Sequence, residues 1–243
     1  MSYVVPLLVV SVLAVVLVGS PGDGAKWLRR WGVLRPTEDD VRSATAHLRR
    51  RNATYVAVWC VCVVATIAFG EIPGITNDIV LRLWFPVASG LLLGEVLMAM
   101  RRQKGAVRRA SLVPRRREDL VPLWATVLEV ALFTATVTAS LTSTGDLAVS
   151  LGGAVLAVGL VETTIRLAVL RVPAGEAKVD MAMRLASCRM ALGAGYVLLG
   201  CFLAARVSPW VPGLPVVVLL VGTALACVVV IYLPPRRTPE ATG

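Results

Sequence analysis

Charged residues are scarce in this sequence. They make up 16% of the 243 residues, against roughly 25% in an ordinary soluble domain. Hydrophobic residues make up 57%, against roughly 45–50%, and the mean hydropathy is +0.76. This composition excludes a soluble globular protein and predicts an integral membrane protein.

Residues that build catalytic or metal centres are also few. A multi-histidine metal site or a Ser-His or Cys-His catalytic set would need the single histidine, His47. The five cysteines contain no CxxC pair and all fall in apolar runs, which is typical of small core residues. No P-loop or dinucleotide-binding glycine motif occurs. We therefore expect no cofactor, no metal and no catalytic residues.

Seven apolar runs are long enough to cross a bilayer, which takes about 20 residues per helix. They are 3–19, 53–72, 80–100, 121–142, 147–170, 185–205 and 214–233. The first has the length of a secretory signal, but no positive charge precedes it and Pro21 follows the cleavage point, which favours a retained helix. The sequence thus predicts an all-α polytopic bundle of about seven transmembrane helices, with 1–243 as a single membrane domain.

Lys and Arg are concentrated in alternate connections. Of the 25, 22 lie in or beside the basic segments 20–52, 101–120, 171–184 and the tail 234–243. The connections at 71–79, 143–146 and 207–213 contain none. Because positively charged loops stay in the cytoplasm, we expect a multi-pass protein of the plasma (inner) membrane with its N-terminus outside and its C-terminus cytoplasmic.

The net charge of +10 is also explained by this placement. Basic loops at a membrane surface attract anionic lipid headgroups. We therefore expect anionic lipids as partners and no nucleic acid.

The basic segment 20–52 contains a predicted helix. Thr37 and the acids at 38–40 supply an N-cap and negative charge at its start, and the arginines at 49–51 supply positive charge at its end. A narrow apolar stripe follows helical spacing at Val41, Ala44 and Leu48. Two interpretations fit: a helix that lies on the membrane surface, or a helical lead-in to the second span, which we favour.

Two spacings indicate an internal repeat. The arginines before successive helix hairpins, Arg51, Arg117 and Arg184, are 66 and 67 residues apart, and Glu95 and Glu162 are 67 apart. A duplication would give one helix followed by three parallel hairpins, related by an axis along the membrane normal. Hairpins of equal length would produce most of the same spacing without a duplication.

Three motifs carry a resemblance to a known family. They are Pro-Thr-Glu-Asp-Asp with His-Leu-Arg-Arg-Arg at 36–51, Gly-x-x-x-Gly-Glu at 90–95, and Arg-Arg-Ala-Ser-Leu at 108–112 with the arginines at 115–117. In these motifs the chain resembles an uncharacterised family of multi-span integral membrane proteins from high-GC bacteria. The resemblance implies a multi-span membrane protein and brings no assigned activity.

Three glutamates, Glu95, Glu129 and Glu162, interrupt the apolar runs. A charge at the bilayer centre costs on the order of 2.5–3.5 kcal/mol, so such a residue usually faces protein or water. Glu95 lies roughly 9 Å from the cytoplasmic edge, within reach of water or the basic cluster at Arg101. Glu162 has Arg166 at i+4, which predicts either a self-neutralised pair or a site for an anion or proton. Glu129 has no cation within helical reach.

Polar and small residues form stripes around two of these glutamates. One stripe holds Thr126, Glu129, Thr136, Ser140 and Ser143, and the next run holds Gly152, Gly159, Glu162, Thr163 and Arg166. Stripes that face each other would enclose a polar pathway; the alternative is close packing with interhelical hydrogen bonds. The candidate polar intramembrane site consists of Glu129, Glu162, Arg166, Glu95, Thr126 and Thr136.

Small residues at four-residue spacing predict tight helix contacts. They are Gly90 and Gly94 on one run, and Ser187, Ala191 and Gly195 on another. We expect these contacts inside the bundle, and secondarily in a homo-oligomer.

Two classes of function fit these features. We favour a non-catalytic membrane component, either a scaffold or an accessory subunit of a transport or signalling complex with a protein partner, because no catalytic or nucleotide-binding constellation occurs. The alternative is a small proton- or ion-coupled transporter that uses Glu129, Glu162 and Arg166. An intramembrane enzyme ranks third.

Overall fold

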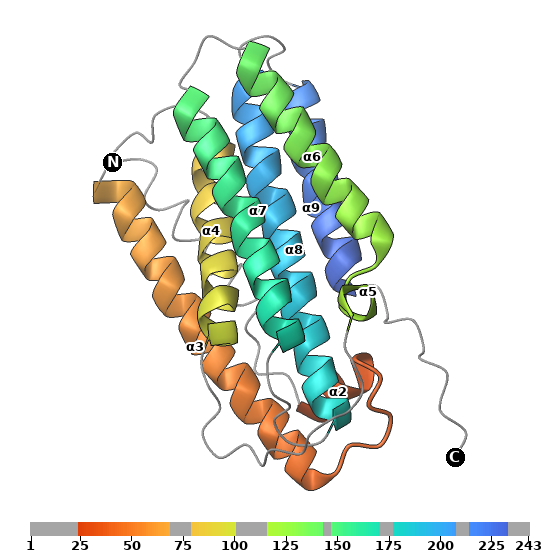
Figure 1. Cartoon of the computed structure of the whole chain (residues 1–243). Helices are drawn as coiled ribbons and strands as arrows, with labels where there is room; N and C mark the ends of the chain where they lie inside the picture. The colour runs from red at the N-terminus through yellow and green to blue at the C-terminus, as the bar shows by residue number, and fades with distance from the viewer. Residues whose placement is uncertain are drawn as a thin grey trace.

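The computed structural model describes residues 24–68, 79–100, 116–142, 147–170, 177–207 and 214–232. Within these ranges the fold is all-helical, as predicted, with eight helices and no strand. In chain order they are α2 (Gly24–Arg30), α3 (Glu38–Ala68), α4 (Ile79–Met100), α5 (Arg117–Leu120), α6 (Leu123–Thr142), α7 (Leu147–Leu170), α8 (Ala177–Val207) and α9 (Leu214–Tyr232) (Figure 1). The first apolar run, 3–19, lies outside the described residues.

The remaining six apolar runs each overlap one of the long helices. Helix α7 has the predicted bounds, whereas α8 extends past its run, 185–205, at both ends. Within the described ranges, three helices are long and apolar enough to cross a membrane: Leu123–Thr142, Leu147–Leu170 and Lys178–Val207. Shorter apolar helices lie at Trp84–Met100 and Val221–Ile231. These helices are compatible with the predicted membrane protein.

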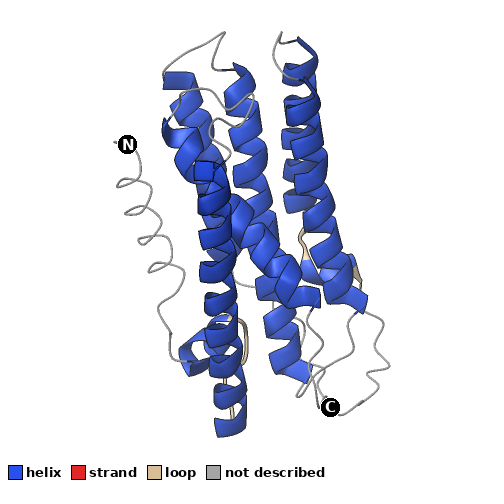
Figure 2. Cartoon of the chain, turned by 90° about the vertical axis from the view of Figure 1, so that its left-hand side faces the viewer, coloured by secondary structure: helices blue, strands red, loops and turns tan. Residues whose placement is uncertain are grey.

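Helix α8 forms the centre of the bundle. It packs against α4, α6, α7 and α9, and 89% of its apolar window is buried, compared with 22% for α6 and 33% for α7. Glycines permit this close approach: a Cβ at Gly195 would lie 2.6 Å from Val161 of α7, and one at Gly200 would lie 2.7 Å from Thr223 of α9. The long helices run lengthwise through one bundle, with the short α2 at one end (Figure 1, Figure 2).

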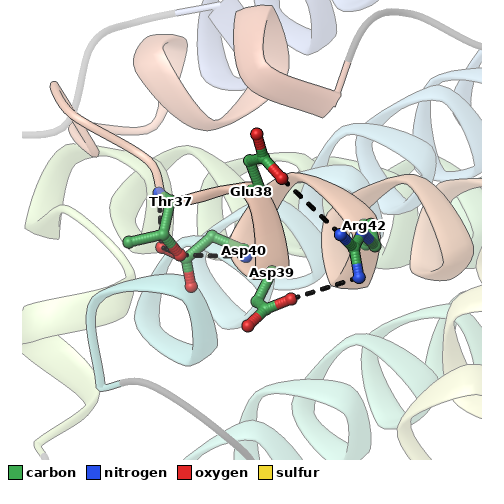
Figure 3. Close-up of polar contacts among 5 residues, drawn as sticks. All are labelled: Thr37, Glu38, Asp39, Asp40 and Arg42. Carbon is green, nitrogen blue, oxygen red and sulfur yellow. Dashed lines mark hydrogen bonds and ion pairs between the residues drawn. The ribbon is translucent and has the colours of Figure 1, made fainter.

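Helix α3 is continuous from the basic segment into the bundle, which agrees with the lead-in interpretation. Its first turn has the expected cap (Figure 3): the Asp40 amide donates to the Thr37 hydroxyl (3.2 Å), and Asp40 Oδ2 accepts from the Thr37 amide (2.9 Å) and hydroxyl (2.8 Å). Arg42 pairs with Glu38 (3.6 Å) and Asp39 (3.4 Å). The helix start is therefore fixed by its own side chains.

The apolar stripe of α3 faces α2 and the rest of the protein. Ala44 is buried in the same core cluster as Leu28 and Trp31, and Leu48 is also buried. Gly24 allows the two helices to meet, since a Cβ there would lie 2.8 Å from a backbone carbonyl oxygen of α3. Contacts with α2 cover part of this stripe, which favours the lead-in interpretation over a helix that lies on the membrane surface.

The small residues named from the sequence lie at helix contacts inside the bundle. A Cβ at Gly90 would lie 3.1 Å from the Trp59 Cα of α3, and Gly94 faces the Tyr55 ring. On α8, Ala191 is fully buried, and Ser187 is half-buried. These positions therefore serve packing within the chain.

Candidate functional site

Arg117 brings two intramembrane glutamates of neighbouring helices together. Its guanidinium binds Glu162 of α7 through both terminal nitrogens, with Nη2–Oε1 at 2.6 Å and Nη1–Oε2 at 3.0 Å. The same Nη2 lies 4.0 Å from Oε2 of Glu129 on α6. We call Arg117, Glu129 and Glu162 the Arg117 cluster. It joins α5, α6 and α7 at one polar centre.

The partner of Glu162 differs from the one that helical spacing predicts. Arg166, at i+4, is exposed, and the ion pair that the structure gives Glu162 is with Arg117. A planar guanidinium whose two terminal nitrogens meet both oxygens of a carboxylate makes a stronger contact than a flexible i,i+4 pair on a helix surface. The two residues are 45 positions apart in the sequence, so helical periodicity could not reveal the pair.

Burial increases across the cluster from Arg117 to Glu129. The side chains of Arg117, Glu162 and Glu129 are 39%, 27% and 5% exposed. Among the described residues, Oε1 of Glu129 and Nε of Arg117 have no hydrogen-bond partner. One end of the cluster thus reaches the protein surface, and the other holds a buried carboxylate with an unsatisfied oxygen.

The polar stripe of α6 binds backbone carbonyls. The Thr136 hydroxyl donates to Leu132 O (2.8 Å) and lies 3.4 Å from Leu199 O of α8. The Ser140 hydroxyl donates to Thr136 O (2.7 Å). Thr126 is half-buried. Thr136 and Ser140 are therefore satisfied by the helices themselves, in agreement with the interhelical hydrogen-bonding interpretation.

The polar stripe of α7 does not face α6 along its length. Gly152, Gly159, Thr163 and Arg166 are exposed, and a Cβ at either glycine would meet no described atom within 4 Å. The buried face of α7 consists of Ser150, Ala154, Ala157, Val161, Thr164, Ile165 and Ala168. Small apolar residues allow the closer approach to α8, so they occupy the inner face. The predicted pair of facing stripes is reduced to the one meeting point at Arg117.

Glu95 is fully buried, in contrast to the predicted access to water. The Tyr55 hydroxyl of α3 donates a hydrogen bond to Glu95 Oε1. The Arg51 guanidinium lies 5.6 Å from the centre of the Tyr55 ring and attracts the Glu95 carboxylate. We call Arg51, Tyr55 and Glu95 the Glu95 cluster. The neighbouring Gly94 lets α3 approach closely enough to cover the carboxylate; Arg101 lies outside the described residues.

The two clusters have the same plan. Arg51 precedes Glu95 by 44 residues, and Arg117 precedes Glu162 by 45. In each case an arginine at the start of a hairpin faces a glutamate on the hairpin's second helix. The corresponding arginine of the third hairpin, Arg184, instead contacts an acid of its own helix, because the second helix there carries only apolar residues at the equivalent positions.

Helix α8 also carries buried cations that sequence reasoning did not place in the site. They are Arg184, Arg189 and Arg206. Arg184 Nε donates to Asp180 Oδ2 (2.8 Å), and Arg206 Nε donates to Ser150 Oγ of α7 (2.6 Å). The i,i+4 spacing of Asp180 and Arg184 was the one available signal. Arg184 Nη1 also donates to Ala168 O of α7, so the central helix is anchored to α7 by polar contacts near both of its ends.

Among the described residues, no group of three or more His, Cys, Asp or Glu side chains is arranged to hold a metal ion. Comparison with protein families, with curated proteins and with solved structures gave no match for this chain. The functional interpretation therefore rests on the chain's own residues.

Proposed function

We propose that the chain is an integral protein of the inner membrane that crosses it seven times, with its N-terminus outside. The apolar runs, the three candidate spans and the positions of Lys and Arg support this proposal. Figure 1 places α2, the start of α3, α5 and the start of α8 at the same end of the bundle, and these elements hold the described parts of the basic segments. The one-helix-plus-three-hairpins arrangement and the family resemblance belong to the same proposal.

Within that membrane protein, we propose the role of a non-catalytic component, a scaffold or an accessory subunit. The observation that carries this proposal is the pairing of charges between and within helices: Arg117 of α5 binds the partly exposed Glu162 of α7, and Arg184 binds Asp180 in the buried part of α8. Such pairs, with a central helix that is covered on all sides, fix one arrangement of helices. The exposed cations of α2 and α3 then contact anionic lipids, at roughly 1 kcal/mol for each Lys or Arg.

A second candidate is a proton- or ion-coupled transporter. The observation that favours it is the meeting of Glu129 and Glu162 at Arg117, where a buried carboxylate is linked to a partly exposed one. Intramembrane acids in this arrangement are typical of ion pathways. Arg166, the third residue of the sequence prediction, lies outside this cluster.

Reconstitution separates the two candidates. The wild-type chain and the variants Glu129→Gln and Glu162→Gln are placed in liposomes with a pH gradient, with Glu118→Gln, an exposed acid of α5, as matched control. If the chain is a non-catalytic component, we expect that no variant changes the proton flux and that the chain co-purifies with a stoichiometric partner. A wild-type flux that is lost in both cluster variants but kept in Glu118→Gln, with unchanged stability, would reject the component role and establish transport.

A further inference from the structure

The Arg117 cluster contains two carboxylates and one guanidinium. Glu162 occupies both terminal nitrogens of Arg117, whereas Glu129 is 4.0 Å away and has an oxygen without a hydrogen-bond partner among the described residues. The Glu129 side chain is 5% exposed. An ionised carboxylate that is buried and incompletely bonded is strongly disfavoured. The cluster therefore lacks one positive charge at Glu129.

We infer that the Arg117 cluster is a binding site for one proton, carried by Glu129, and that Arg117 exchanges between the two carboxylates as the proton binds and leaves. With the proton bound, Glu129 is neutral and Glu162 holds Arg117. The structure shows this position of Arg117. When Glu129 gives its proton to water, it becomes the more buried anion, and Arg117 Nη2 closes the 4.0 Å gap. The site is independent of the proposed function, since a component and a transporter can both bind a proton.

Among the groups around Glu129, Arg117 is the cation that acts on it. From α5 comes Arg117 and from α7 comes Glu162, the two charges that act on Glu129. From α8 comes Tyr196, whose hydroxyl already donates to Ala125 O at 2.6 Å. Helix α9 contributes a thiol next to Tyr196 and adds no charge. The proton is therefore the partner that completes the charge balance.

A route for the proton follows from the burial gradient. Glu162 and Arg117 are 27% and 39% exposed, and Arg117 lies in the basic segment 101–120 that the proposed topology places at the cytoplasmic surface, so water reaches the cluster from the side of Arg117. Glu129 lies behind them. The proton passes between this water and Glu129 past the guanidinium, and the movement of Arg117 opens and closes that passage.

Infrared spectroscopy of the full chain in phosphatidylcholine vesicles at neutral pH tests the inference. A protonated carboxyl has its own C=O stretching band, which shifts in D2O. We expect the band of one carboxyl to be lost in Glu129→Gln. We also expect its loss in Glu162→Gln, because Arg117, without its partner, moves to Glu129 and displaces the proton. Glu118→Gln, an exposed acid, should leave the band unchanged.

The variant at Glu162 is decisive. If Glu162→Gln keeps the band, Glu129 is protonated through burial alone and the exchange of Arg117 is rejected. If Glu129→Gln does not change the spectrum, the proton site is rejected. Glu162→Asp, which weakens the two-point contact with one methylene fewer, gives the same readout should Glu162→Gln not fold. An absence of flux in the liposome experiment does not alter any of these outcomes.

Discussion

Glu95 and its partners come from distant parts of the sequence. Charged residues inside apolar runs could be recognised from the sequence, because few residues interrupt those runs. Their contacts could not, since Tyr55 and Arg51 precede Glu95 by 40 and 44 residues and lie on another helix. Helical periodicity relates residues on one helix only. For that reason it predicted Arg166 as the partner of Glu162 and missed Arg117.

The Tyr55–Glu95 hydrogen bond can be compared with that of a second buried tyrosine. We expect Tyr55→Phe to cost about 1–3 kcal/mol of unfolding free energy, because it leaves a fully buried carboxyl oxygen of Glu95 without its hydrogen-bond donor. Tyr196→Phe, which removes a bond to the neutral Ala125 carbonyl, should cost about 0.5–1.5 kcal/mol. Unfolding of the purified variants in detergent, followed by circular dichroism, measures both. A smaller loss for Tyr55→Phe than for Tyr196→Phe would show that Glu95 does not depend on the Tyr55 hydroxyl.

For the helices, the sequence predicted where each one begins and ends better than which of its faces turns inward. The bounds of α7 and the capped start of α3 followed from apolar runs and from Thr37 with Asp40. The inner face of α7 could not be predicted in this way, because both faces of the helix are apolar enough for a membrane and small residues occur on each. Packing against α8 selects the face with alanines, and sequence periodicity does not record that choice.

The stability of the chain should change in opposite directions when Gly90 and Gly152 are each replaced by alanine. Gly90→Ala places a methyl group 3.1 Å from the Trp59 Cα, so α3 and α4 must separate, at a cost of about 1–3 kcal/mol. Gly152→Ala meets no described atom within 4 Å and should gain up to about 1 kcal/mol from helix propensity. Thermal unfolding in detergent gives the sign of each change. A stable Gly90→Ala variant would contradict the close contact of α3 and α4.

The arrangement of the whole bundle was the least predictable feature. Helix α8 carries Asp180, Arg184, Arg189 and Arg206, and charged residues of a membrane-spanning helix usually face protein or water. The structure places this helix at the centre, where its small residues allow four neighbours to approach. Its charges are then buried against α7 and within α8 itself. Several helices are comparably apolar, so hydropathy alone does not identify the central one.

The seven-crossing topology makes a prediction about the whole molecule. It places the connections before and after the run 121–142 on opposite sides of the membrane. A membrane-impermeant maleimide should therefore label Thr144→Cys in intact cells, and Ser111→Cys only after permeabilisation. The unsubstituted chain is the background control, because its five cysteines lie in apolar runs. The reverse pattern would refute the orientation, and labelling of both positions from the same side would show that 121–142 does not cross the membrane.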